Sequence, residues 1–176
     1  TRVLLPKKEV MYKLVTYVPT QSAQELRNAL FAAGAGALGN YQECSFNLEG
    51  TGTFKPLDGS KPKLGKIGQR HTETEIQIQV SFLRHQKREL IAALKRAHPY
   101  EEVAFDILKL DQDCPEIGMG LIGTLPEALS FEQLLKILKS KFSCGCIKYN
   151  HNALDKIDTV AVLGGSGSFA IDQAKA

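Results

Sequence analysis

Hydrophobic and polar positions alternate most regularly over residues 74–82, Thr-Glu-Ile-Gln-Ile-Gln-Val-Ser-Phe. A period of two indicates a strand with one face buried. Residues 12–18 are rich in β-branched and aromatic side chains and stop at Pro19, which predicts another strand. Residues 103–110 show a similar pattern. We expect all of these strands to belong to one antiparallel sheet.

Helical spacing of apolar residues appears in the segments between these strands. Leucines and alanines line one face of residues 22–33, and Ser22 followed by Glu25 has the form of a capping box. Residues 86–97 repeat the helical spacing and are halted by Pro99. The sequence therefore predicts two amphipathic helices, the first of them capped by Ser22.

Residues 36–54 alternate small, polar and aromatic side chains and predict a strand pair or a bent ribbon. With this segment the order becomes strand, helix, strand, strand, helix, strand. That order is the split βαβ pattern of a ferredoxin-like sandwich, with two helices on one face of the sheet. The fold class expected for residues 10–112 is therefore α+β.

Residues 113–176 follow a different pattern, which predicts part of an α/β layer. Ser130 and Gln133 form a capping box before a third helix. Thr1 is not an initiator Met, and the last residues look like a helix cut off midway, so we expect an excerpt of a longer protein. The strands expected here are residues 118–123, 144–148 and 159–163.

Composition excludes several classes of protein. The chain has 176 residues and a formal charge of +3, too weak by itself to indicate nucleic-acid binding. No apolar run is long enough to span a bilayer, and the first residues do not form a signal peptide, so a cytoplasmic location is expected. The four cysteines are then expected to be reduced. Cys144 and Cys146 would share one face of a strand, which we expect to lie in the core.

The sequence His98-Pro99-Tyr100-Glu101-Glu102 places an imidazole, a phenol and carboxylates at a helix-to-strand junction. Such a corner can bind a cation or a polar ligand, which makes His98, Tyr100 and Glu101 candidate ligand-binding residues. The alternative is that His98 only interacts with the carbonyl end of its own helix, where a partly cationic ring is favoured.

A second candidate is the loop of Gly164, Gly165, Ser166 and Gly167, between a strand and a helix start. Backbone N–H groups and a helix N-terminus there can converge on an anion. The loop lacks the complete P-loop and Rossmann motifs, so no nucleotide specificity follows. A tight strand-to-helix turn explains the same residues.

The long loop over residues 55–70 is rich in Lys, Gly and Pro. It could meet phosphates, or it could be a solvated hairpin, since it has no aromatic platform for bases. The residues alone show no Ser/His/Asp, HExxH or zinc-finger pattern. No cofactor or metal site is evident from the motifs of this chain.

Four blocks together resemble one known family, over about residues 10–176. Residues 52–57 (Gly-Thr-Phe-Lys-Pro-Leu) and 97–107 (Ala-His-Pro-Tyr-Glu-Glu-Val-Ala-Phe-Asp-Ile) are similar to the inserted domain of the Nif-three-like family, the GTP cyclohydrolase 1 type 2 homologues. Residues 118–123 and 160–168 resemble the opening of that family's second core half.

The resemblance implies a PII/CutA-like ferredoxin-like insert, of a kind that tends to trimerise, and part of a Nif-three-like α/β core. It implies a homo-oligomeric ring, capped by the inserts, with metal-dependent hydrolysis of nucleotides at a site of two divalent metal ions. The family's metal ligands come from motifs outside these 176 residues, so no residue here is assigned to the metal. Gly164–Ser168 would line the cleft beside them.

Three functions stay open at this stage. The chain can be a segment of a metal-dependent hydrolase whose metal ligands lie elsewhere. It can be a PII-like regulatory or oligomerising module that senses a nucleotide, another small molecule or a divalent ion. It can also be a purely structural cap that assembles the ring.

Overall fold

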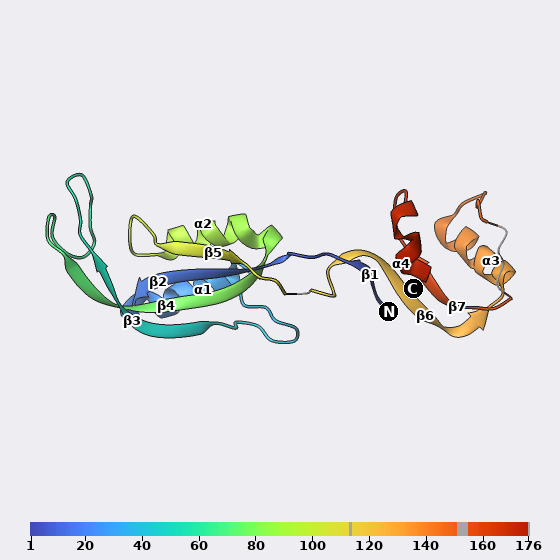
Figure 1. The fold of residues 1–176 in the computed structure, drawn as a ribbon, viewed down its shortest axis with the longest axis horizontal. Helices are drawn as coiled ribbons and strands as arrows, with labels where there is room; N and C mark the ends of the chain where they lie inside the picture. The colour runs from blue at the N-terminus through green and yellow to red at the C-terminus, as the bar shows by residue number, and fades with distance from the viewer. Residues whose placement is uncertain (113, 151–154, 176) are drawn as a thin grey trace. The chain divides into compact units, whose positions relative to one another are not determined.

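The computed structural model describes residues 1–112, 114–150 and 155–175. The chain divides into two compact units, Lys8–Asp113 and a second unit made of Thr1–Lys7 with Cys114–Ala176. Each unit has its own antiparallel sheet, so the chain is a mixed α/β protein (Figure 1). The first seven residues thus join the later part of the chain, which the sequence did not indicate.

Strands β2 (Met11–Pro19), β3 (Phe46–Phe54), β4 (His71–Leu83) and β5 (Phe105–Lys109) form the sheet of unit Lys8–Asp113. Their order is β3-β4-β2-β5, and every neighbouring pair is antiparallel. Strand β4 extends beyond the predicted residues 74–82 at both ends. It is the strand that pairs with both β2 and β3, so its alternation sets the two faces of the sheet.

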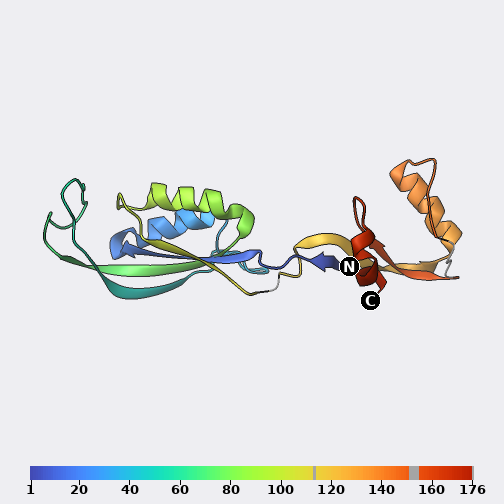
Figure 2. The same ribbon diagram turned by 45° about the horizontal axis from the view of Figure 1, so that its top comes forward.

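Helices α1 (Ala23–Ala32) and α2 (Lys87–Ala97) lie over one face of this sheet (Figures 1 and 2). Both helices were predicted within a residue of their observed ends. They bury one side of β4 and β2, because alternate residues of a strand point to opposite faces. The fully buried core is built mainly from Leu14, Val18, Leu26, Leu30, Ile78, Val80, Leu90 and Leu94.

The opposite side of β4 carries polar residues. Glu75 and Gln77 alternate with the core positions Ile76 and Ile78, and Tyr17 of β2 is paired with Gln77. These side chains belong to the sheet face away from the two helices. The predicted alternation therefore places a polar set of groups on the free face.

The prediction of a strand pair or bent ribbon over residues 36–54 is confirmed only for its second half. There β3 is a strand paired with β4, whereas the first half has only an isolated bridge between Leu38 and Tyr41. The preceding residues turn through positive φ at Gly36, Gly39 and Glu43. The Cys44 N–H donates to the Gly36 carbonyl (2.9 Å), which closes a loop.

The predicted capping box at Ser22 is also wrong. Ser22 ends a 3₁₀ turn, Thr20–Ser22, with φ −100° and ψ −3°, and its side chain makes no capping hydrogen bond. An N-cap side chain reaches the first helical N–H groups from an extended backbone. The box at Ser130 is confirmed: with ψ 158°, Ser130 Oγ accepts from Gln133 N–H at 3.2 Å, and Gln133 Oε1 accepts from Ser130 N–H at 2.8 Å.

The second unit contains β1 (Arg2–Pro6), β6 (Gly118–Leu129), β7 (Ile157–Val162), α3 (Phe131–Phe142) and α4 (Ile171–Lys175). Its sheet has the order β1-β6-β7 with antiparallel pairs. A small core joins one sheet face to the 3₁₀ turn that precedes α4, while apolar side chains of β6 and β7 are exposed. The core residues are Leu4, Ile122 and Ala170, and the exposed ones are Met119, Leu121 and Val162.

The strand expected over residues 144–148 is not observed. After α3 the chain turns at Ser143, in the left-handed conformation, and continues without regular structure to residue 150. The partners of β6 in the sheet are β1 and β7. Cys146 is exposed, so the expected burial of both thiols is wrong, and the four cysteines are free.

None of the helices described in Figure 1 is sufficiently long and apolar to cross a membrane.

The two serine signatures give a matched test of capping. Ser130→Ala removes the acceptor of the Gln133 N–H, and we expect it to destabilise α3 by about 1 kcal/mol. Ser22→Ala removes no capping bond, and we expect a change within about 0.5 kcal/mol. Urea unfolding followed by circular dichroism, and hydrogen exchange at the Gln133 amide, measure the two effects. Equal effects from the two variants would contradict the assignment.

Candidate functional site

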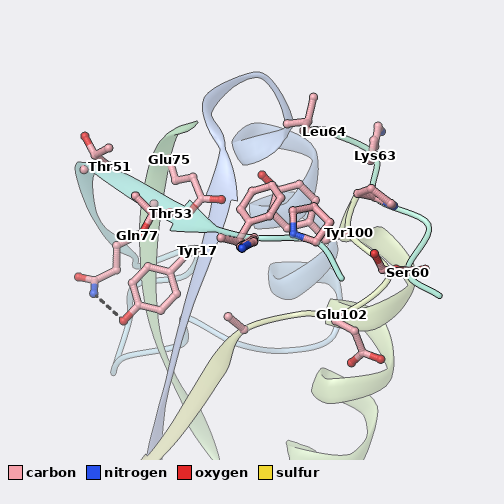
Figure 3. A pocket seen from close by; sticks show the side chains of 18 of the residues that line it. Tyr17, Thr51, Thr53, Ser60, Lys63, Leu64, Glu75, Gln77, Tyr100 and Glu102 are labelled. Atoms are coloured by element: carbon pink, nitrogen blue, oxygen red, sulfur yellow. Dashed lines mark hydrogen bonds between the residues drawn. The ribbon is translucent and has the colours of Figure 1, made fainter. Parts of the chain in front are cut away.

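A cavity of about 600 Å³ lies in unit Lys8–Asp113. Strands β3 and β4, the loop 55–70 and the segment 98–104 surround it. Figure 3 shows Tyr17, Glu75, Gln77 and Tyr100 among the side chains that line it. The cavity therefore joins the free sheet face to the corner that the sequence singled out.

Glu75 reaches the cavity from β4, and Gly52 of β3 leaves room for its carboxylate. A Cβ atom at Gly52 would overlap the Glu75 carboxylate, whereas a Cβ at Gly50 would meet nothing within 4 Å. Gly52 has no positive φ, so its small size rather than its conformational freedom matters here. The glycine thus lets the Glu75 carboxylate lie flat against β3.

Tyr100 presents its hydroxyl near this carboxylate. The hydroxyl oxygen is buried and has no hydrogen-bond partner among the described residues. Burial, and then the neighbouring carboxylate of Glu75, raise the pKa of Tyr100. The phenol therefore stays protonated and can donate one hydrogen bond, for which a bound molecule or a slightly moved Glu75 is the available acceptor.

His98 fixes the start of the corner. Its side chain is 7% exposed, its Nδ1 accepts from the Tyr100 N–H (3.1 Å), and its Nε2–H donates to the Tyr17 carbonyl (2.8 Å). Because Nδ1 is an acceptor, the proton of the neutral ring must be on Nε2. Burial lowers the pKa of His98, against the opposing effects of the Tyr17 carbonyl and Glu75.

This geometry corrects the alternative in which His98 only serves its own helix. The ring bonds to β2 rather than to the last carbonyls of α2, and burial favours the neutral form over the partly cationic one. Both ring nitrogens are used inside the chain, so His98 positions Tyr100. A direct contact of His98 with a ligand stays a prediction.

The other end of the corner is held by two more hydrogen bonds. The Thr16 hydroxyl donates to the Ala104 carbonyl at 2.9 Å. Glu101 Oε1 accepts from the backbone N–H of Lys61 at 2.8 Å. Glu101 therefore ties the long loop to the corner and closes one side of the cavity.

Four aromatic rings form a row beside the cavity. The ring centroids of His71 and Phe54 are 5.2 Å apart, those of Phe54 and Tyr100 are 5.7 Å apart, and those of Tyr100 and His98 are 5.2 Å apart. The two histidines are thus separated by two rings. His85 is exposed elsewhere in the unit, and His151 lies outside the described residues.

The basic side chains of the 55–70 loop are exposed, and two of them, Lys55 and Lys63, border the cavity. The loop is closed by the Gly68 N–H, which donates to the Pro56 carbonyl at 2.8 Å. Anion binding by this loop stays a prediction.

The loop of Gly164, Gly165, Ser166 and Gly167 belongs to the second unit. Gly165 and Gly167 have φ values of 83° and 58°, and the Ser168 N–H donates to the Ser166 carbonyl at 2.7 Å. The α-helix that follows, α4, has only five residues. These features describe a tight turn, and its role as a ligand site stays a prediction.

Across residues 1–112, 114–150 and 155–175, no three His, Cys, Asp or Glu side chains lie close enough together to hold a metal ion. His71 Nε2 and Glu73 Oε2 are 3.0 Å apart, but they are only a pair. The described residues therefore do not fit the site of two divalent metal ions that the family resemblance implies.

Sequence reasoning missed Tyr17, Glu75, Gln77 and Phe54 as parts of a site. The alternation of residues 74–82 does place Glu75 and Gln77 on the face opposite the core, which was a usable signal. The sequence did not show which segments meet in space. The pairing of β2 with β4 and the hydrogen bond from His98 to β2 bring the segment 98–104 beside Glu75 and Gln77.

The family model and the curated relatives agree on one family. The model of the Duf34/NIF3 (NGG1p interacting factor 3) family matches residues 13–176. A "GTP cyclohydrolase 1 type 2 homolog" of Bacillus subtilis is 38% identical over 176 residues, which are 99% of this chain and 47% of that protein. The protein of the same description from Halalkalibacterium halodurans is 40% identical over 91% of this chain and 43% of its own length.

A solved structure, that of a Bacillus cereus protein related to NIF3, matches with a TM-score of 0.78 and 40% identity. The match covers 98% of this chain and 46% of that chain. The present chain therefore spans about half the length of the relatives it matches.

The lowered pKa of His98 predicts a pH dependence of stability. A folded-state pKa below the ordinary value of 6.5 means that the unfolded chain binds the proton more readily. The free energy of unfolding should fall as the pH drops below 6.5 and level off below the folded-state pKa. Replacing His98 by Gln should reduce this fall, and should cost about 1 to 3 kcal/mol at pH 7.5 through lost hydrogen bonds.

Urea unfolding at pH 7.5 and pH 5.0 measures both effects. His85→Gln is the matched control, because His85 is exposed. If the free energy of unfolding of both the His98→Gln and the His85→Gln proteins falls with decreasing pH as in the unchanged chain, the buried imidazole does not cause the pH dependence.

Proposed function

The chain belongs to the Duf34/NIF3 family, and on that premise we propose that it supplies a small-molecule-binding module to a protein of the GTP cyclohydrolase 1 type 2 homolog kind. In this proposal the module is unit Lys8–Asp113, with PII-like regulatory character. Tyr100 and Glu101 are binding residues, and His98 holds Tyr100 in place.

The observation that carries the proposal is the cavity of about 600 Å³. Its volume lies in the range of small-molecule sites, and such sites combine apolar walls with a few converging polar groups. Here Phe54 and Tyr17 supply aromatic surface, while Glu75 and the unpartnered Tyr100 hydroxyl supply polar groups. A small molecule with an apolar part and a polar group is the class of ligand that fits.

The finer fold assignment is part of the same proposal. Unit Lys8–Asp113 has the element order β2-α1-β3-β4-α2-β5, and β4 lies between β2 and β3 in the sheet. A strand inserted between the two strands of a βαβ unit is the split βαβ arrangement. We therefore assign this unit to the ferredoxin-like, PII/CutA-like class and the second unit to part of a Nif-three-like α/β core.

We place the hydrolytic, metal-dependent chemistry of such a protein outside this chain. The proposal is compatible with the described residues, among which no three His, Cys, Asp or Glu side chains lie close enough together to hold a metal ion. It is also consistent with the share of the relatives that the chain spans, 47% of the Bacillus subtilis protein. The two divalent metal ions and their ligands would belong to the remaining half.

The proposal also includes a cytoplasmic location.

It further includes self-association, as a trimer or a hexameric ring. Exposed apolar side chains support an assembly role for the second unit, where Met119, Leu121 and Val162 are each more than half exposed. Large apolar groups of this kind mark contact surfaces when they are contiguous. In the sheet, Leu121 is paired with Val162 and Met119 is two residues away on the same face.

The placement of the chemistry predicts that residues 1–176 do not hydrolyse GTP. Purified chain would be incubated with GTP and Mg²⁺, Mn²⁺ or Zn²⁺, and products would be separated by anion-exchange chromatography, with the full-length Bacillus subtilis relative tested in parallel. Turnover by the chain that rises with its concentration and matches the longer protein would contradict the proposal.

Binding at the cavity is tested separately by NMR with a library of fragment-sized molecules. Hits should shift the amides of Gly50 and Gly52 in β3 and of Tyr100 and Glu101 in the corner. The control region is the loop 164–168 of the second unit. If the hits move only that loop, or if no fragment moves the cavity amides, the module is not a ligand-binding one.

A further inference from the structure

The charges around the cavity are not equivalent. Among the described residues that line the cavity, Glu75 is the one charged residue that is partly buried. In Figure 3 its carboxylate points toward the Tyr100 ring, while Lys63 and Glu102 extend away. The charged residues at the exposed rim are Glu49, Lys55, Lys63, Glu101 and Glu102.

Burial makes the Glu75 carboxylate the dominant charge for a bound molecule. Exposed charges are screened by water and salt, and those of the rim are of both signs. A partly buried charge interacts more strongly, because the surrounding dielectric constant is lower. Glu75 lies 2 residues from Gln77 on the same strand face, and no cation pairs with it in the part of the chain described.

The walls beside Glu75 are aromatic. Tyr17 is held by Gln77, whose Nε2–H donates to the Tyr17 hydroxyl at 3.3 Å. The Phe54 and Tyr100 rings are tilted against each other at 5.7 Å. Faces of aromatic rings attract cations, and the attraction grows when the cation leaves water. Aromatic walls around an unpaired carboxylate favour an organic cation.

We infer that the cavity binds a small organic cation, an amine or guanidinium compound with an attached apolar group, whose charge rests on the Glu75 carboxylate. The inference rests on the proposed binding function of the unit and adds the chemical class of its ligand. The Tyr100 hydroxyl donates a second bond to Glu75 or to an acceptor on the ligand, and Tyr17 and Phe54 cover the apolar part.

The test uses three probes of the same size and different charge. These are 2-phenylethylamine as the cation, 2-phenylethanol as the neutral molecule and phenylacetate as the anion, each titrated at pH 7.5 into the full chain of residues 1–176. Amide shifts in the NMR spectrum give the affinity and the location. We expect the amine to bind about tenfold more tightly than the alcohol, from one charge-assisted hydrogen bond.

Two pairs of variants separate charge from position. Glu75→Gln should weaken binding of the amine about tenfold and remove its preference over the alcohol, whereas Glu102→Gln at the rim should change it less than about threefold. Gly52→Ala keeps the charge of Glu75 but displaces its carboxylate, so it should also weaken the amine. Gly50→Ala, with open space at its Cβ, is the control and should bind normally. Thermal unfolding of each variant confirms that it is folded.

The outcomes distinguish the inference from the proposed function. If the alcohol binds at the cavity as tightly as the amine and Glu75→Gln has no effect, the charge inference is overturned and the binding function stands. Tighter binding of phenylacetate, or binding of Zn²⁺ or Mn²⁺ alone at Glu75, also overturns it. If none of the three probes shifts the cavity amides, the inference fails, while the binding function is decided separately by the fragment library.

Discussion

The neutral imidazole of His98 is the interaction on which the candidate site depends. It links the Tyr17 carbonyl in β2 to the Tyr100 N–H in the chain that leaves α2. A buried ring that donates at one nitrogen and accepts at the other satisfies both groups only in the neutral state. Its environment lowers the pKa and so favours that state. Together with the Thr16–Ala104 hydrogen bond, this link fixes the turn after α2 against β2 and holds Tyr100 beside the cavity.

The helices cover one face of the alternating strand β4, and the cavity lies on its other face. Strand β4 buries Ile78 and Val80 beneath the helices, and the same periodicity directs Glu75 and Gln77 to the other side. A slip of one residue in the pairing of β4 would exchange the two sets. The apolar core therefore fixes the register, and the register places the carboxylate. Stability and binding chemistry are connected here through backbone pairing rather than through contacts between the core and the ligand.

The sequence was informative where local rules determine the outcome. The alternation over residues 74–82 and the spacing of leucines identified the strand and both helices of the first unit. The capping motifs show the limit of such rules, because Ser22 and Ser130 have the same signature and only Ser130 has the extended backbone that capping needs. The strand expected at residues 144–148 is absent because strand formation requires a partner, and both edges of β6 are occupied, by β1 and β7. The corner at His98 was recognised from its residue types, but its connection to β2 was not, since that contact joins residues 81 positions apart.

Overall charge gives the wrong impression of the cavity. The chain is basic, with a formal charge of +3, and its long loop carries exposed lysines, of which Lys55 and Lys63 border the cavity. On composition alone, an anion is the natural partner for that loop. Yet the lysine ends are exposed to water, where their field is screened, and the partly buried group is a carboxylate. The sign of charge that a ligand meets is thus decided by the register of β4 and the small size of Gly52, which together place Glu75 against β3. Local burial outweighs net charge here, because electrostatic interactions strengthen as water is removed.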